Sequence, residues 1–278
     1  HAAELTVAGN VISRVQAEST PTVRITGNTL TGSERIELVG SSMAAEVSEN
    51  APADGDGGSV TIWGDAPDGA VLTADLPYVV SGVAVPAGTT LTLGAGSVVK
   101  FAGSGGSSPQ IGFVTRGRLI VAGTETAPVV FTSLGDDSVG GDSGNDGPNT
   151  TTTAQWYFAP LTIAGAGRIE VAHADVRGSR YFVLASTTNW PNWGTDAGTG
   201  GSITVEHSVI RSTNGVDVTA GLASVAVRDT RFEGPDGVRV VAPGRATDVV
   251  VENTDLGDAG TIHADTAGSV RIAGSTIS

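Results

Sequence analysis

The 278-residue chain lacks cysteine, which excludes both a disulfide framework and a thiolate metal site. Basic residues are scarce: 15 lysines and arginines, of which Lys100 is the only lysine, stand against 29 acidic residues, and the formal net charge is −14. Nucleic acids and anionic membrane surfaces need a basic partner face, so we expect neither as a partner. No apolar run approaches the ~18 residues of a membrane span, so we expect no membrane insertion. The acidic balance instead suits solubility and the binding of divalent cations.

Long helical periodicity is also missing, and we find no amphipathic helix. The chain contains 40 glycines and is rich in valine, threonine, serine and alanine. Its apolar residues fall in short alternating runs that end in turn residues, which is typical of β-strands. The sequence therefore predicts an all-β protein.

A nine-residue unit recurs along the chain and predicts how these strands are arranged. The clearest copies are ELTVAGNVI (4–12), TVRITGNTL (22–30), RIELVGSSM (35–43), RIEVAHADV (168–176), SITVEHSVI (202–210), SVAVRDTRF (224–232), DVVVENTDL (248–256) and SVRIAGSTI (269–277). The last four copies begin 22, 24 and 21 residues apart. One unit cannot bury its own apolar face, so successive units must stack. A period of 21–24 residues with a strand, turn and strand in each unit predicts a parallel β-solenoid.

Each position of the unit has its own chemistry. The second, fourth and ninth positions are apolar, as in Ile203, Val205 and Ile210, and alternation places the second and fourth on one strand face. The seventh position is small and polar, which predicts a ladder of polar side chains at a turn. The fifth position carries Glu206, Arg228 and then a second glutamate, Glu252. In-register stacking would make these three an acid–base–acid ladder; the alternative is a solvated face with chance alternation.

The central third of the chain resembles a known family. The matching segments are VPAGTTLTL (85–93), GSVVKF (96–101), GRLIVAGT (117–124), APVVFTS (127–133), DDSVGGDSGNDG (136–147) and AQWYFAPLTIAGAGRIEVAHADV (154–176). Together they resemble the right-handed parallel β-helix modules of bacterial extracellular proteins in the pectate-lyase-like superfamily. The resemblance implies a right-handed β-helix and a secreted or cell-surface setting. It implies no single activity, because the superfamily includes lyases, hydrolases, adhesins and structural stalks.

We therefore expect residues 1–278 to form one parallel β-helix with long loops at 135–154 and 186–201. The chain begins at His1 rather than methionine, and repeat units extend from residue 4 to residue 277 without a capping helix. Solenoid ends need a polar cap to avoid association. We expect that the chain was excised from a longer protein, whose neighbouring coils or domains would cover its ends.

The acidic loop, residues 135–148, is the candidate metal site. It offers hard oxygen ligands in a glycine-rich segment, and Ca²⁺ takes six to eight such ligands. The candidate ligands are Asp136, Asp137, Asp142, Asn145 and Asp146. The spacing fits neither an EF-hand nor the nonapeptide calcium repeat. The alternative is a solvated loop rich in Asx-turns.

The aromatic loop, residues 186–201, is the candidate carbohydrate site. Trp190 and Trp193 lie in a segment rich in proline, asparagine and glycine, and Tyr181 is close in sequence. Exposed rings on a rigid scaffold can stack on sugar faces, so a polysaccharide or other glycan is the expected ligand. The alternative is that both tryptophans fold back over the outer wall of the helix.

A third candidate is a histidine row at the sixth position of the unit. His173 and His207 would be followed there by Asp229 and Asn253 on later coils. Such a row could bind a metal or supply an acid and a base one coil apart. The alternative is an exposed turn column in which glycine serves equally well. The first two histidines are 34 residues apart, so their stacking requires an inserted loop between them.

Catalytic signatures are missing. The sequence contains no GxSxG, HExxH or P-loop pattern, and no Gly-His-Gly or RxPxxR segment of the kind found in polygalacturonases and pectate lyases. We therefore expect a non-enzymatic rigid structural or ligand-presenting module of a secreted or cell-surface bacterial protein. The alternative is a polysaccharide lyase or glycoside hydrolase of the same superfamily.

Overall fold

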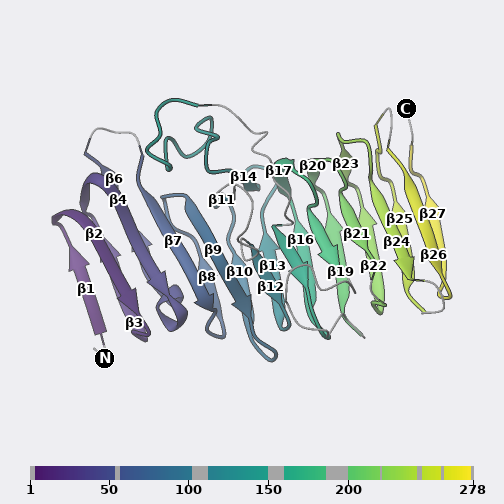
Figure 1. Cartoon of the computed structure of the whole chain (residues 1–278), viewed down its shortest axis with the longest axis horizontal. Coiled ribbons are helices and arrows are strands. Elements are labelled where there is room, and N and C mark those ends of the chain that lie inside the picture. The colour runs from purple at the N-terminus through teal and green to yellow at the C-terminus, as the bar shows by residue number, and fades with distance from the viewer. Residues whose placement is uncertain are drawn as a thin grey trace.

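The computed structural model describes residues 4–53, 57–101, 112–149, 160–185, 200–219, 221–242, 246–257 and 260–276. Within these residues the chain forms 27 strands, all paired in parallel, and one short 3-10 turn, η1 (Gly40–Ala44). Coil follows coil along the long axis from the N-terminal to the C-terminal end (Figure 1). The predicted parallel β-helix is confirmed. No helix among the described residues is long and apolar enough to cross a membrane.

The strands form three sheets. A short N-terminal sheet contains β1 (Glu4–Ala8), β3 (Thr22–Thr26) and β5 (Glu46–Ser48). An eight-stranded sheet contains β8 (Ala70–Leu72), β10 (Thr90–Leu93), β13 (Arg118–Ala122), β16 (Arg168–Ala172), β19 (Ser202–Glu206), β22 (Ser224–Arg228), β25 (Asp248–Glu252) and β27 (Val270–Ala273).

A 16-stranded sheet divides into two arms. Its stem is β2 (Val11–Glu18), β4 (Thr29–Val39), β6 (Ala51–Pro52), β7 (Ser59–Asp65) and β9 (Tyr78–Val85). One arm continues with β11 (Val98–Phe101), β14 (Val129–Ser133), β17 (Ala174–Ser179), β20 (Val209–Ser212) and β23 (Arg231–Phe232). The other continues with β12 (Phe113–Thr115), β15 (Leu161–Ile163), β18 (Val183–Ala185), β21 (Val216–Val218), β24 (Val238–Ala242) and β26 (Ile262–Thr266).

The two arms meet at β9. Its first half pairs with β11 and its second half with β12. Gly82 lies between the two halves with a φ of 90°, a conformation that favours glycine because it has no side chain. This bend gives the later coils three strand faces around one core.

The core contains the apolar positions of the repeat unit. Ile203, Val205 and Ile210 are fully buried, as the alternation predicts. A column of phenylalanines fills the middle of the helix: the Phe101 and Phe131 ring centroids lie 6.3 Å apart, and those of Phe131 and Phe182 lie 5.6 Å apart. Parallel in-register stacking therefore turns a sequence position into a buried column.

The predicted polar turn ladder is present. The Asn28 side chain donates a 2.8 Å hydrogen bond to Asn50 Oδ1 and a 3.0 Å bond to the Val7 carbonyl, and its own Oδ1 accepts from the Asn10 backbone N–H at 3.0 Å. Further along, the Ala174 N–H donates to Ser208 Oγ at 3.0 Å. These bonds satisfy backbone groups at a buried turn, which explains why the seventh position is polar.

One repeat assignment is wrong. The unit at 35–43 lies in β4 and η1, where Arg35 stacks beside Arg14 of β2 on a different sheet from β3. The coil that follows β3 is β5, in which Val47 pairs with Ile25. Its weaker apolar pattern hid this coil, because alanine occupies the position where the other units carry a larger side chain.

The predicted charge ladder is confirmed. Arg228 lies between two glutamates on adjacent coils, 3.0 Å from Glu206 and 3.1 Å from Glu252. Arg271 of the last coil extends the ladder with a 3.0 Å contact to Glu252. These pairs are partly exposed, so each contributes about 1 kcal/mol or less to stability. Their main effect is to spread opposite charges along a face that would otherwise repel itself.

Candidate functional site

The acidic loop follows β14 and packs across earlier coils. Gly140 lies so close to Pro77 that a β-carbon at this glycine would come within 2.3 Å of the proline ring. Beneath the loop, the side chain of Lys100 on β11 is completely buried, and its Nζ donates a 2.6 Å hydrogen bond to the Gly141 carbonyl oxygen. Lys100 occupies an outward position of its strand, so its burial comes from the loop above it. The loop is therefore fixed on the scaffold by a buried ammonium group.

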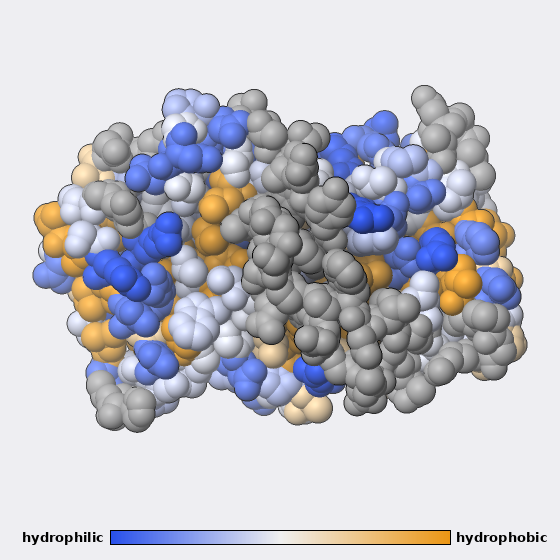
Figure 2. Space-filling view, viewed as in Figure 1, coloured by the Kyte–Doolittle hydropathy of each residue, from blue (hydrophilic) through white to orange (hydrophobic). Residues whose placement is uncertain are grey.

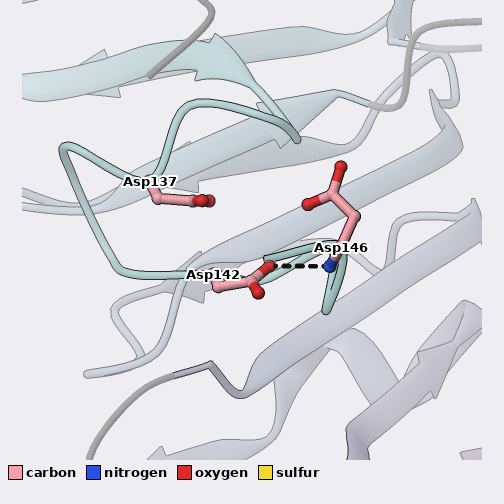
Figure 3. Close-up of side chains that lie close together, drawn as sticks. All are labelled: Asp137, Asp142 and Asp146. Atoms are coloured by element: carbon pink, nitrogen blue, oxygen red, sulfur yellow. Dashed lines mark hydrogen bonds between the residues drawn. The ribbon is translucent and has the colours of Figure 1, made fainter. Parts of the chain in front are cut away.

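Three of the predicted metal ligands come together in this loop. Carboxylate oxygens of Asp137, Asp142 and Asp146 all lie within 4.8 Å of one another (Figure 3). Backbone N–H groups orient two of these side chains: Asp142 accepts from Asp146 at 3.1 Å and from Gly147 at 2.9 Å, and Asp137 accepts from Asn149 at 2.7 Å. Asp137 Oδ1 is buried and has no hydrogen-bond partner among the described residues. This oxygen is available to a cation.

The other two predicted ligands have different surroundings. Asp136 is fully buried and accepts hydrogen bonds from Thr132 Oγ1 and Ser138 Oγ, both at 2.5 Å. It lies outside the three-aspartate cluster and closes the turn after β14. Asn145 is exposed, and its left-handed backbone, with φ of 52°, forms the turn between the aspartates at 142 and 146.

The protein environment shifts the pKa values of two carboxyl groups of the loop in opposite directions. Burial raises the pKa of Asp137, and the nearby Asp142 raises it further, although the Lys100 charge partly opposes this shift. Burial also raises the pKa of Asp142, but hydrogen bonds from the backbone outweigh it and the net pKa is lowered. A divalent cation would relieve the repulsion that Asp137 experiences. Three carboxylates, one of which has an unpartnered oxygen, fit a hard cation such as Ca²⁺, which would take its remaining ligands from backbone carbonyls and water.

A second candidate surface is a groove on the outer face of the eight-stranded sheet. It has a volume of about 560 Å³ and crosses β13, β16, β19 and β22. Its lining includes Ile120, Arg168, Glu170, Ser202, Thr204 and Glu206. These residues project from the first, third and fifth positions of the repeat, which alternate with the buried ones. The groove therefore offers hydroxyl, carboxylate and guanidinium groups on a rigid floor.

Arg168, which lines the groove, has a second arginine beside it on the neighbouring strand. Arg118 and Arg168 occupy paired positions on adjacent strands. Both approach the same carboxylate: Arg118 lies 2.7 Å from Glu170 and Arg168 lies 3.7 Å from it. The Arg168 side chain remains 60% exposed. Two guanidinium groups thus share one carboxylate and can still donate hydrogen bonds outward.

The predicted aromatic site is described only in part. Trp190 and Trp193 lie outside the described residues. Tyr181 is partly buried; the Arg180 guanidinium lies over its ring, 5.2 Å from the centroid. Its hydroxyl lies 3.2 Å from the Asn214 amide, which can accept its hydrogen bond. Tyr181 thus belongs to a polar corner before β18.

The predicted histidine row is formed. β16 pairs with β19 in register, so the two histidines lie on adjacent coils although they are 34 residues apart in the sequence. The imidazole centroids of His173 and His207 lie 5.0 Å apart, with 17° between the ring planes. On the following coils, Asn253 Nδ2 donates to Asp229 Oδ1 at 3.2 Å. Stacking of the coils thus converts a sequence column into a line of polar side chains.

Sequence reasoning missed two features of these sites. The buried role of Lys100 was hidden because the residue lies in a strand motif; its being the only lysine was the available signal. The groove was missed because its residues are spread over four coils, each contributing ordinary polar side chains at outward positions.

Comparison of the chain with protein families, curated proteins and solved structures finds no match.

Proposed function

We propose that this chain is a rigid, non-enzymatic module that binds and presents a glycan, within a secreted or cell-surface bacterial protein of the pectate-lyase-like superfamily. The groove on the eight-stranded sheet carries this proposal. Its floor is a stack of paired strands, so the groove keeps its shape without a ligand and ordering costs on binding are small. Serine, threonine, glutamate and arginine side chains match the hydroxyl groups of a sugar chain as donors and acceptors.

The aromatic loop supports a sugar ligand in particular. Residues 186–199 connect Ala185, the last residue of β18, to Gly200, which comes two residues before Ser202 of the groove. Trp190 and Trp193 therefore lie close in sequence to a residue of the groove. Aromatic rings stack on the apolar faces of sugars, while polar groups of the groove would bond their hydroxyls.

We test this proposal with affinity electrophoresis on a panel of neutral and acidic polysaccharides. Arg168→Ala is expected to weaken retardation by a retained polysaccharide, as is the double variant Trp190→Ala/Trp193→Ala. Arg24→Ala is the matched control, because this arginine is 57% exposed and also pairs with a glutamate, but lies on the N-terminal sheet. The proposal would be overturned if no polysaccharide in the panel retarded the protein, or if Arg24→Ala lost as much retardation as Arg168→Ala.

The same polysaccharides also distinguish the module from an enzyme. Release of reducing ends and of unsaturated products is measured after prolonged incubation in calcium buffer. A non-enzymatic module releases neither. Either product, at a rate proportional to protein concentration, would replace the proposed function by a glycoside hydrolase or a polysaccharide lyase.

Ca²⁺ is the proposed cofactor of the acidic loop. Asp137, Asp142 and Asp146 would hold the ion, whose role is to hold the loop on the scaffold. We expect Ca²⁺ to raise the melting temperature above that in EDTA, and Asp142→Asn to remove the increase. Asp65→Asn, at an exposed strand end, should retain it. If the wild-type protein melts at the same temperature in 1 mM Ca²⁺ and in EDTA, the calcium site is excluded.

The ends of the rod are proposed to contact neighbouring coils or domains of a longer protein. On β27, Val270 and Ile272 are 46% and 53% exposed, whereas Val249 and Val251 of the preceding coil are fully buried at the same positions. Hydrophobic residues are visible at both ends of the rod in Figure 2. We expect Val270→Ser/Ile272→Ser to reduce concentration-dependent association in sedimentation experiments. Unchanged association would show that these side chains attract no neighbour.

A further inference from the structure

The stacked histidine pair lies outside both proposed sites and has a different ligand chemistry. His173 and His207 stand on adjacent coils at the turn that follows the eight-stranded sheet. The His207 side chain is exposed and that of His173 is partly buried. Imidazole nitrogen favours zinc, copper and nickel, whereas the carboxylates of the acidic loop favour calcium.

Backbone hydrogen bonds hold the two histidines on adjacent coils. The His173 N–H donates to the Glu206 carbonyl at 3.1 Å, and the His207 N–H donates to the Arg228 carbonyl at 3.2 Å. Both histidines have a φ of 51°, in the left-handed region. Two consecutive coils thus hold the two histidine backbones in the same conformation, so a shared ligand would not have to order the backbone.

From this geometry we infer that His173 and His207 form a binding site for a first-row transition metal ion. A nitrogen–metal bond is about 2.0–2.1 Å, so two imidazole nitrogens on one tetrahedral ion lie about 3.4 Å apart. The rings are centred 5.0 Å apart and need only converge by rotating about their side-chain bonds. Water completes the coordination.

The surroundings favour a cation at this place. Asp229 follows His207 on the next coil and is exposed, so its carboxylate places negative charge next to the pair. The net charge of the chain, −14, raises the local concentration of cations around the whole molecule. The expected order of affinity is Cu²⁺ above Ni²⁺ and Zn²⁺, with Mn²⁺ weakest among these ions, because nitrogen sites follow this order.

We test the site by isothermal titration of the metal-free protein with CuCl₂, NiCl₂ and ZnCl₂. All proteins carry His1→Ala, so that this residue cannot supply a ligand. We expect one Cu²⁺ per chain, and each of His173→Asn and His207→Asn should weaken binding by about tenfold or more, since even outer partners of metal ligands are worth 10–100-fold. Asparagine preserves the left-handed turn, as Asn253 does at the same position with φ of 48°.

His263→Asn is the matched control. His263 is exposed on β26 and stacks beside Arg239 rather than beside a second imidazole. The His263→Asn variant should therefore bind Cu²⁺ with unchanged affinity. Electron paramagnetic resonance of the Cu²⁺ complex should show two coupled imidazole nitrogens, reduced to one in either single variant. Absence of saturable binding, or binding that survives both single variants, would overturn the inference.

Discussion

Replacing Lys100 by methionine tests whether a buried ammonium group anchors the acidic loop. The side chain is fully buried and donates a 2.6 Å hydrogen bond to the Gly141 carbonyl oxygen. A hydrogen bond from a charged donor contributes about 1.5–3 kcal/mol. Methionine fills nearly the same volume, so a cavity adds little. The desolvation cost of the ammonium disappears at the same time and offsets part of the loss. We expect a net destabilisation of about 2 kcal/mol.

The assay is urea unfolding followed by circular dichroism, with EDTA present to keep metal ions from compensating. Arg118→Met is the matched control, because this arginine also projects outward from a strand but is 48% exposed in its ion pair with Glu170. An exposed pair contributes about 1 kcal/mol or less, so the control should lose less than the Lys100 variant. Hydrogen exchange at the Asn149 amide, which donates to Asp137, should also become faster in the Lys100 variant. Equal stability of the two variants, with unchanged exchange, would refute the anchoring role.

Three further predictions concern the core, the turn ladder and the charges of the loop. Phe131→Ala should lower the free energy of unfolding by about 3–5 kcal/mol, measured by urea unfolding, because Phe131 lies between two other rings of the core; a loss below 1 kcal/mol would contradict the packing. Asn28→Ala should cost about 2–4 kcal/mol, since it leaves several buried partners unpaired; its urea midpoint should fall below that of the unchanged protein, and an equal midpoint would mean that water replaces the side chain. The third prediction pairs two adjacent aspartates. Burial raises the pKa of Asp136, but hydrogen bonds from Ser138 and Thr132 outweigh it, so its net pKa is lowered. The ionised Asp136 stabilises the folded protein at pH values above the pKa of about 3.9 that an aspartate has in the unfolded chain. This stabilisation is lost as the pH falls through the lower pKa of Asp136 in the folded protein. Asp136→Asn should therefore lower stability at pH 7 and flatten the loss in acid. The raised pKa of Asp137 has the opposite consequence. Ionisation of Asp137 is less favourable in the folded protein than in the unfolded chain, so it lowers stability at pH values above the folded-state pKa of this group. Asp137→Asn in EDTA should therefore raise stability at pH 7. Urea unfolding curves from pH 2 to pH 7 measure the stability of both variants. If both variants are more stable, or both less stable, than the wild-type protein at pH 7, the opposite pKa shifts of the two aspartates are refuted.

The repeat pattern was sufficient to predict the fold class and most of the stacking register. Apolar alternation with a repeated turn fixes which residues face inward, so the burial of Ile203 and the flanking of Arg228 by two glutamates could be predicted. It also predicted that His173 and His207 would stack, because a parallel coil adds one strand spacing and leaves side chains in line. The repeat could not distinguish which of the three faces a unit occupies, and for this reason residues 35–43 were assigned to the wrong sheet.

The roles of the outward-facing side chains follow from contacts between coils and loops. Nothing local buries Lys100; a loop that follows it by 41 residues covers it and accepts its hydrogen bond. The same folding back separates Asp136, which serves a turn, from Asp137, which joins the aspartate cluster, although the two are adjacent in the chain. The groove, likewise, exists only once four coils are stacked. The periodic core is encoded locally and repeated, whereas the anchoring of the acidic loop depends on a contact between segments that no period relates.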